Sequence, residues 1–166
     1  MFTKSAKFYD ALFHFKDYKK ESDNLREIIR SYKHDARTLL DVACGTGKHL
    51  QYLSEFISAE GIDYSKELLD IAGERCPGVI FHQGDMTGFD LKKKYDVITC
   101  LFSSIGYVRT AENLFKAVSC FSEHLNNNGL LIIEPWFSPQ TYWKDRLTAN
   151  FYDGPDLKIA WMYKSG

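Results

Sequence analysis

The sequence alternates short, apolar, β-rich segments with segments whose apolar residues recur at helical spacing, and this alternation limits the fold more than any other feature. Strands are expected at 38–43, 59–64, 79–83, 95–102 and 130–134. Helices are expected between them, at 24–33, at 48–57, from an N-cap at Ser65 and after Thr110. Strands that alternate with helices predict an α/β fold with a doubly wound, mostly parallel sheet flanked by helices. In such a sheet the ligand site lies at the carboxyl ends of the strands.

Length and composition indicate a single ordinary domain. The chain has 166 residues, 45% of them hydrophobic, which is enough for one sizeable core. The formal net charge is -1 and the basic residues are dispersed except at 92–94, so no nucleic-acid-binding or membrane-binding face is expected. No apolar run is long enough to span a bilayer and the N-terminus is polar, which favours a cytoplasmic protein. The four cysteines lack metal-ligand spacing, so we expect reduced structural thiols and no metal site.

The segment 41–47, Asp-Val-Ala-Cys-Gly-Thr-Gly, directly follows the first expected strand and opens a helix. In that context Gly45 and Gly47 predict a cofactor-binding loop, because glycine lets the backbone turn tightly and approach a ligand without a Cβ clash. A dinucleotide fingerprint would need a third small residue at position 50, which is Leu50. The loop therefore counts against a nicotinamide cofactor.

Carboxylates mark the ends of the first three expected strands, with Asp41 at the end of the first, Asp63 at the end of the second and Asp85 after the third. A dinucleotide presents a pyrophosphate, whereas S-adenosylmethionine (SAM) presents a sulphonium and an ammonium group and no phosphate. We therefore expect SAM, with S-adenosylhomocysteine as its product. Asp63 can accept both ribose hydroxyls, and Asp85 can accept from the adenine amine while Met86 contacts the ring. Asp41 can orient the glycine turn or receive the methionyl ammonium through water; the alternative for each aspartate is to cap a helix or turn.

Further motifs occur in order along the chain. They are Leu-Leu-Asp-Val-Ala-Cys-Gly-Thr-Gly at 39–47, Gly-Ile-Asp at 61–63, Gly-Asp-Met at 84–86, Phe-Ser-Ser-Ile-Gly-Tyr at 102–107 and Glu-Pro-Trp-Phe at 134–137. Together they resemble the ordered motifs of class I SAM-dependent methyltransferases, which implies a Rossmann-like core. The chain is most similar to the N,N-dimethyltransferases that act on nucleotide-linked amino sugars.

The resemblance also implies roles for single residues. SAM contacts are implied for Tyr18, Ala43, Asp63, Asp85, Met86 and the backbone of Leu101. Tyr9 matches a family tyrosine near the reacting amine, and Tyr107 can orient an amine through its phenol oxygen; packing is the alternative for both. Trp136 and Phe137 can flank a sugar or a nucleotide base, or they can seal the sheet edge. Asp63 stands where the sugar enzymes often have glutamate, and either carboxylate can hold a ribose.

His124 is the histidine that would best suit a general base, since imidazole titrates near neutral pH. It falls late in an expected helix, however, where the C-terminal dipole gives an imidazole a structural explanation. The remaining histidines have no metal-like spacing and no catalytic role is expected for them.

Class I methyltransferases normally finish the sheet with an antiparallel strand pair, and the sugar enzymes insert further strands for a substrate lid and dimer contacts. Here the pattern weakens after Pro139 and only 158–164 is expected as a strand, so the closing C-terminal pair is expected to be absent. Either the chain is a fragment or a shortened paralogue, or another chain completes its edge, as in a homodimer. The expected organisation is an N-terminal helical lid and first helix at 1–35, a SAM-binding core at 36–139, and the start of a substrate-lid or dimerisation segment at 140–166.

The expected function is transfer of a methyl group from SAM to a small-molecule amine, such as a nucleotide-linked amino sugar. One alternative is a small-molecule O- or N-methyltransferase with an unrelated acceptor. Another is a non-catalytic SAM-binding module, which the short C-terminus would explain.

Overall fold

The computed structural model describes residues 6–135 and 140–165. The chain forms two compact units: one spans 17–136, and the other comprises the two ends of the chain, 1–16 and 137–166. The first unit contains the sheet and the glycine loop.

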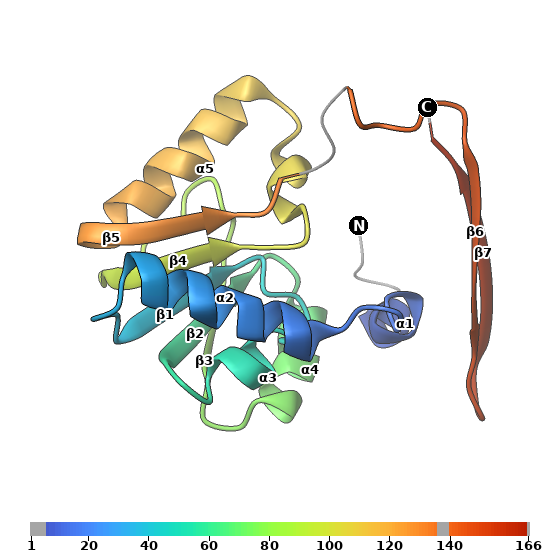
Figure 1. Cartoon of the computed structure of the whole chain (residues 1–166), viewed down its shortest axis with the longest axis horizontal. Coiled ribbons are helices and arrows are strands. Elements are labelled where there is room, and N and C mark those ends of the chain that lie inside the picture. The colour runs from blue at the N-terminus through green and yellow to red at the C-terminus, as the bar shows by residue number, and fades with distance from the viewer. Residues whose placement is uncertain (1–5, 136–139, 166) are drawn as a thin grey trace. The chain divides into compact units, whose positions relative to one another are not determined.

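The unit 17–136 is built on a five-stranded sheet with the order β3-β2-β1-β4-β5 (Figure 1). The strands are β1 (Thr38–Val42), β2 (Ser58–Asp63), β3 (Ile80–Gln83), β4 (Tyr95–Cys100) and β5 (Leu125–Ile133). Every neighbouring pair is parallel, which confirms the prediction of a parallel α/β sheet. The strand order reverses between β1 and β4, which is where such sheets bind ligands.

The helices of this unit are α2 (Tyr18–Tyr32), α3 (Leu50–Leu53), α4 (Lys66–Arg75), the 3-10 helix η1 (Ser104–Val108) and α5 (Ala111–Glu123). The predicted N-cap at Ser65 is confirmed, since its side chain accepts from the Leu68 N–H. The N-cap of α5 is Thr110, which accepts from the Asn113 N–H in the same way. The helix predicted at 48–57 is shorter than expected, whereas the helix predicted at 24–33 begins earlier.

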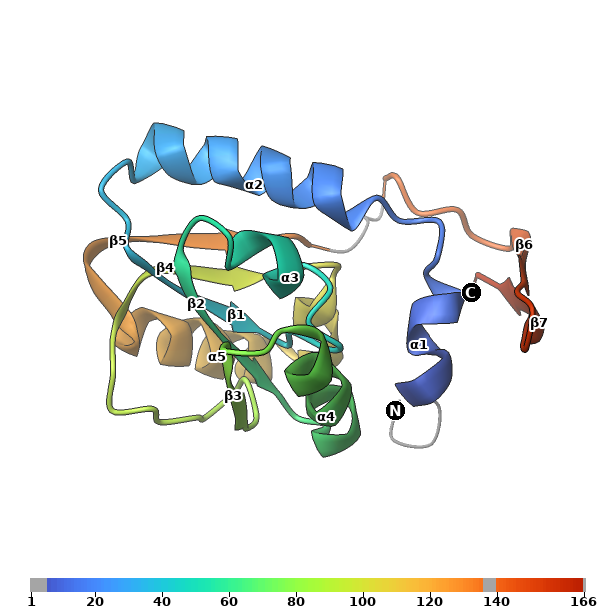
Figure 2. The same cartoon turned by 90° about the horizontal axis from the view of Figure 1, so that it is seen from below.

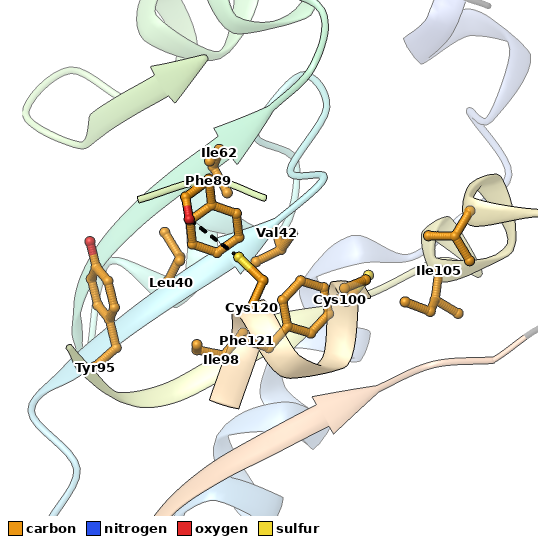
Figure 3. Packing of buried hydrophobic residues seen from close by; sticks show 12 residues of the cluster. Leu40, Val42, Ile62, Phe89, Tyr95, Ile98, Cys100, Ile105, Cys120 and Phe121 are labelled. Atoms are coloured by element: carbon orange, nitrogen blue, oxygen red, sulfur yellow. Dashed lines mark hydrogen bonds between the residues drawn. The ribbon is translucent and has the colours of Figure 1, made fainter. Parts of the chain in front are cut away.

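Two buried clusters fill the two faces of the sheet, because successive strand residues point to opposite faces. Helices α2 and α3 cover one face and α5 covers the other (Figure 2). The first cluster comprises Leu25, Ile29, Leu39, Leu50, Leu53, Ile57, Ala59, Cys76, Val97 and Leu101. The second comprises Leu40, Val42, Ile62, Phe89, Tyr95, Ile98, Cys100, Ile105, Val108, Ala117, Cys120 and Phe121. In the second, the Cys120 thiol donates to the Phe89 carbonyl at 3.3 Å (Figure 3).

The connection from α5 to β5 differs from the prediction. The helix ends at Glu123 and β5 already begins at Leu125, so the Asn-Asn-Asn-Gly segment 126–129 belongs to the strand rather than to a turn. The pairing explains this, because Tyr95 lies opposite Leu125 and the register with β4 then shifts before Val97. The irregularity takes up the extra residues.

The second unit contains α1 (Ala6–Leu12) and an antiparallel pair, β6 (Leu147–Asp153) with β7 (Lys158–Lys164). The prediction that the chain lacks a C-terminal antiparallel strand pair is therefore wrong. The pair forms a two-stranded sheet of its own. The strand at 158–164 was expected, but β6 was not, because its Ala, Asn and Asp residues lower the strand propensity of the segment.

Among the described residues, no helix is long and apolar enough to cross a bilayer. The described part of the chain also holds no group of three or more His, Cys, Asp or Glu side chains placed to bind a metal ion. All four cysteines are unpaired, and all but Cys44 are buried.

Candidate cofactor site

The loop after β1 takes a left-handed backbone at three positions: Ala43 with φ 59°, Gly45 with φ 57° and Gly47 with φ 74°. A Cβ at Gly47 would lie 3.2 Å from the Cβ of Ala72 and 3.4 Å from the Sγ of Cys76, so this glycine lets the loop pack against α4. A Cβ at Gly45 would meet nothing within 4 Å. Gly47 therefore serves packing, whereas Gly45 borders open space that a ligand could occupy.

Asp63, at the end of β2, fastens this loop to the neighbouring strand. Its Oδ2 accepts the Gly45 N–H at 2.9 Å, and its Oδ1 accepts the Ser65 N–H at 2.9 Å. Burial raises the pKa of Asp63, while the hydrogen bonds from the Ser65 and Gly45 amides oppose that rise. Because each carboxylate oxygen can accept more than one hydrogen bond, these contacts leave capacity for ribose hydroxyls.

Asp41 lies beneath the loop and is only 2% exposed. It stands opposite Thr99 in the register of β1 with β4, and its Oδ1 accepts from the Thr99 hydroxyl at 2.7 Å. Burial raises the pKa of Asp41 to about 6, although His49 nearby lowers it. Both predicted roles of Asp41, orienting the glycine turn or receiving the methionyl ammonium through water, remain predictions.

Asp85 follows β3, the next strand along the sheet, and is exposed. Its Oδ1 accepts from both the N–H and the hydroxyl of Thr87, at 2.8 Å and 2.7 Å, so the alternative role of holding a turn is realised. Met86 is partly buried and packs against the second buried cluster. The proposed contacts of Asp85 and Met86 with adenine remain predictions.

The loop after β4 is left-handed without any glycine, with φ 51° at Phe102 and 58° at Ser103. The Phe102 N–H donates to the Glu134 carboxylate at 2.7 Å, and the Ser103 hydroxyl donates to the Pro135 carbonyl at 3.2 Å. Leu101, expected to offer its backbone to SAM, is buried, and its carbonyl accepts the Ser104 N–H at 3.1 Å. Backbone strain of this kind persists where the surroundings enforce it, and it concentrates at functional sites.

Glu134 belongs to the Glu-Pro-Trp-Phe motif at 134–137, but the sequence predicted no role for it. Its only signal was a carboxylate directly after the fifth strand. Glu134 lies after β5 at the same sheet edge as the three aspartates, because all five strands are parallel.

The two candidate catalytic tyrosines lie in different units. Tyr107 is on η1 and 53% exposed, and its pKa is raised by partial burial and by the negative charge of Asp63. Tyr9 is on α1, in the other unit, where its ring lies 4.9 Å from that of Phe13. Trp136 and Phe137, the predicted substrate contacts, lie outside the described residues.

Tyr18 is the first residue of α2 and belongs to the sheet unit. Its ring packs edge-on against His49, with the centroids 4.9 Å apart. His49 follows the glycine loop directly and was given no role from the sequence.

His124 has both ring nitrogens bonded within the fold. Its Nδ1 lies 2.8 Å from the Cys120 carbonyl, and its Nε2 lies 3.1 Å from the Leu91 N–H. Since the Leu91 amide can only donate, Nε2 accepts and Nδ1 carries the proton. The arrangement supports the structural interpretation of His124 rather than a general base.

Comparison with known proteins identifies the family. Residues 39–129 match a family described as "Methyltransferase domain", a segment that runs from β1 into β5. The chain therefore belongs to this methyltransferase family, and the prediction of a class I methyltransferase domain is confirmed.

Relatives with narrower descriptions share more than the fold. The chain is 42% identical over 128 residues to a dTDP-3-amino-3,4,6-trideoxy-alpha-D-glucopyranose N,N-dimethyltransferase of Streptomyces venezuelae, an alignment that covers 76% of this chain and 54% of that protein. The crystal structure of Streptomyces venezuelae DesVI matches with a TM-score of 0.89 and 36% identity, covering 96% of this chain and 69% of that one. SAM-bound CalS10, an amino pentose methyltransferase from Micromonospora echinaspora, matches with a TM-score of 0.87 and 32% identity, covering 94% and 67%.

The chain spans about half the length of the curated relatives it matches. Family membership thus rests on the shared sheet and motifs. The activity, substrate and partners are treated as proposals.

Proposed function

We propose that this chain is the SAM-binding part of an N,N-dimethyltransferase for a nucleotide-linked amino sugar. The observation that carries the proposal is the 42% identity to a dTDP-amino-sugar N,N-dimethyltransferase across 128 residues, which include the glycine loop and its aspartates. Two further relatives, at 39% and 36% identity, carry names of the same reaction on other dTDP-amino sugars. The amino group acted on differs among the three names, at C3 in two and at C4 in one.

The charge of the sheet edge supports SAM rather than a dinucleotide. Asp41, Asp63 and Asp85 lie at or just after the carboxyl ends of three adjacent strands of the parallel sheet, and a pyrophosphate would be repelled there. Open space at Gly45 provides room for the ligand next to the Asp63 carboxylate. In this arrangement Asp63 would hold the ribose, and Asp85 with Met86 would hold the adenine.

Bound SAM would supply an electrophilic methyl group on a sulphonium, and the sulphur would leave with the bonding electron pair. The neutral amine of the acceptor supplies its own lone pair, so the protein needs no strong general base. Its main task is to align the amine with the methyl group, and positioning of this kind contributes up to about 7–11 kcal/mol in the best intramolecular models. Tyr107 is proposed to orient the amine through its phenol oxygen.

The direct test is methyl transfer from labelled SAM to a panel of acceptors. The panel contains dTDP sugars with an amino group at C3 or C4, the same sugars without the nucleotide, and unrelated small amines and alcohols. We expect dimethylated product from one class of dTDP-amino sugar, detected by mass spectrometry. Transfer restricted to acceptors that are not sugars would refute the sugar assignment and leave a methyltransferase of another specificity.

Binding is tested separately by calorimetry with SAM, S-adenosylhomocysteine and NAD. We expect binding of the first two and none of the third. SAM binding without transfer to any acceptor in the panel would favour the non-catalytic alternative, and no SAM binding at millimolar concentration would refute both. The predicted homodimer is tested by light scattering, and the predicted cytoplasmic location by fractionation.

A further inference from the structure

A buried histidine connects the end of the glycine loop to the first turn of α2. His49 is 8% exposed, and its Nε2 lies 2.9 Å from the Glu21 carboxylate. Because a carboxylate only accepts, Nε2 must carry the proton that it donates to Glu21. The Tyr18 ring packs edge-on against the same imidazole. His49 therefore contacts the helix through both a hydrogen bond and an aromatic face.

Two more contacts join the same parts of the chain. The Ser22 hydroxyl, 1% exposed, donates to the His49 carbonyl at 3.5 Å. The Lys48 ammonium lies 5.9 Å from the centroid of the Tyr18 ring, within the range of a cation–π interaction. Tyr18, Glu21 and Ser22 are spaced as i, i+3 and i+4, so they share one face of α2. Residues 48 and 49 thus hold one face of the first helical turn.

His49 also lowers the pKa of Asp41, the buried residue of β1 that accepts from Thr99 on β4. Glu21 and His49 are 28 residues apart in sequence, so only the tertiary fold brings them together.

The first turn of α2 depends on these tertiary contacts more than the rest of the helix does. Lys19 and Lys20 are exposed, and the buried apolar residues of the helix, Leu25 and Ile29, come only later. Helix ends have unpaired backbone groups and fray unless side chains or packing hold them. Asp17 caps the helix by accepting the Lys20 N–H, but that bond is local and does not orient the turn against the sheet.

We propose that His49 is a positioning residue that fixes the first turn of α2 against the glycine loop and so sets the Tyr18 side chain for SAM. This inference rests on the proposed SAM-binding function. In this role His49 need not touch the cofactor. It acts through the Glu21 hydrogen bond and the packing of its ring on Tyr18.

The test measures SAM affinity by calorimetry for three variants of the full chain. His49→Phe keeps an aromatic ring but removes the donor, Glu21→Ala removes the acceptor, and Glu21→Gln keeps an uncharged acceptor. We expect His49→Phe and Glu21→Ala each to weaken SAM binding about tenfold, the effect of losing one charge-assisted hydrogen bond, and Glu21→Gln to recover most of the loss. Glu21 lies on the partly exposed face of a helix, so its variants give a result even if His49→Phe fails to fold.

Asp23→Asn is the matched control. It breaks the exposed Lys19–Asp23 ion pair on the same helix, and SAM affinity should stay at the wild-type value. Thermal unfolding without ligand checks that every variant is folded at the assay temperature, so an affinity loss cannot be attributed to unfolded protein.

A double-mutant cycle separates positioning from general support. If His49 acts through Tyr18, the loss caused by His49→Phe should largely disappear in a Tyr18→Leu background. Equal losses in both backgrounds would overturn the proposal, as would wild-type affinity in His49→Phe and Glu21→Ala. Absence of SAM binding by the wild-type chain would instead refute the proposed function itself.

Discussion

The loop after β1 and the loop after β4 leave neighbouring central strands at the same edge of the sheet, yet they hold a left-handed backbone in different ways. The first relies on glycine at two of its three left-handed positions, with Gly47 packed against α4 and Gly45 bonded to Asp63. The second uses Phe102 and Ser103, which are hydrogen-bonded to Glu134 and Pro135 just after β5. In the first loop, glycine makes the left-handed backbone conformation accessible. In the second loop, hydrogen bonds from a neighbouring segment hold the backbone in that conformation.

The substitution Asp63→Ala tests how strongly the Asp63 hydrogen bonds stabilise the first loop. The change removes the acceptor for both the Gly45 and the Ser65 amide and, in the proposed site, for the ribose. With charge-assisted hydrogen bonds at about 1.5–3 kcal/mol each, we expect a loss of about 3 kcal/mol in unfolding free energy and about a hundredfold in SAM affinity. Urea unfolding and calorimetry measure the two. Wild-type SAM affinity in this variant would show that the ribose lies elsewhere.

The buried charge below the first loop should make stability depend on pH. Burial raises the folded-state pKa of Asp41 from 3.8 to about 6, so the folded protein binds this proton more tightly than the unfolded chain does. The contribution of Asp41 is therefore most favourable below pH 3.8 and is lost as pH rises through about 6.

Asp41→Asn removes this titration while keeping an acceptor for Thr99. We expect the unfolding free energy of the variant, relative to that of the wild type, to increase by at most about 3 kcal/mol between about pH 4 and pH 6. Above about pH 6 the difference between the two proteins should stay constant. A constant difference at all pH values would mean that Asp41 titrates normally. Urea unfolding across this pH range provides the measurement.

The same contrast explains how much could be predicted from the sequence. The glycine loop, the Ser65 cap and the strand-end aspartates depend on local patterns, because a parallel sheet brings the carboxyl ends of its strands to one edge. The Phe102–Glu134 and Glu21–His49 hydrogen bonds join residues 32 and 28 positions apart. Glutamate and histidine occur on many surfaces for other reasons, so no local pattern marks such partners.

The missed elements of the fold have a related cause. Segment 126–129 resembles a turn by composition, but it lies between Leu125 and Leu130, which pair with β4, and so it is held within β5 as an irregularity. In β6, Thr148 and Asn150 alternate with Ala149 and Phe151, and the strand forms because each residue finds a partner on β7. Tertiary pairing overrode weak local propensity in both places.

One substitution at a left-handed position of each loop tests whether the two loops differ in their need for glycine. Gly45→Ala places a side chain at φ 57°, which should cost about 1–2 kcal/mol of unfolding free energy, and its Cβ should also enter the proposed ligand space. Ser103→Gly relieves similar strain but loses the hydrogen bond to Pro135, so we expect a change of less than about 1 kcal/mol. Denaturant unfolding of both variants tests this. Equal destabilisation would contradict the distinction between the loops.

The smallest expected effect concerns the hydrogen bond from the Phe102 N–H to Glu134, just after β5. Glu134→Ala leaves the Phe102 amide without its acceptor, but the site is exposed and water can replace part of the bond, so the expected cost is about 1 kcal/mol. The effect should be local: hydrogen exchange at the Phe102 amide should accelerate several-fold, while the Gly45 amide, held by Asp63, should exchange at the wild-type rate. Glu134→Gln keeps an acceptor oxygen and should fall between Glu134→Ala and the wild type. An unchanged exchange rate at the Phe102 amide would mean that the left-handed turn persists without the Glu134 hydrogen bond. Faster exchange at both amides would mean that the two loops are stabilised together rather than separately.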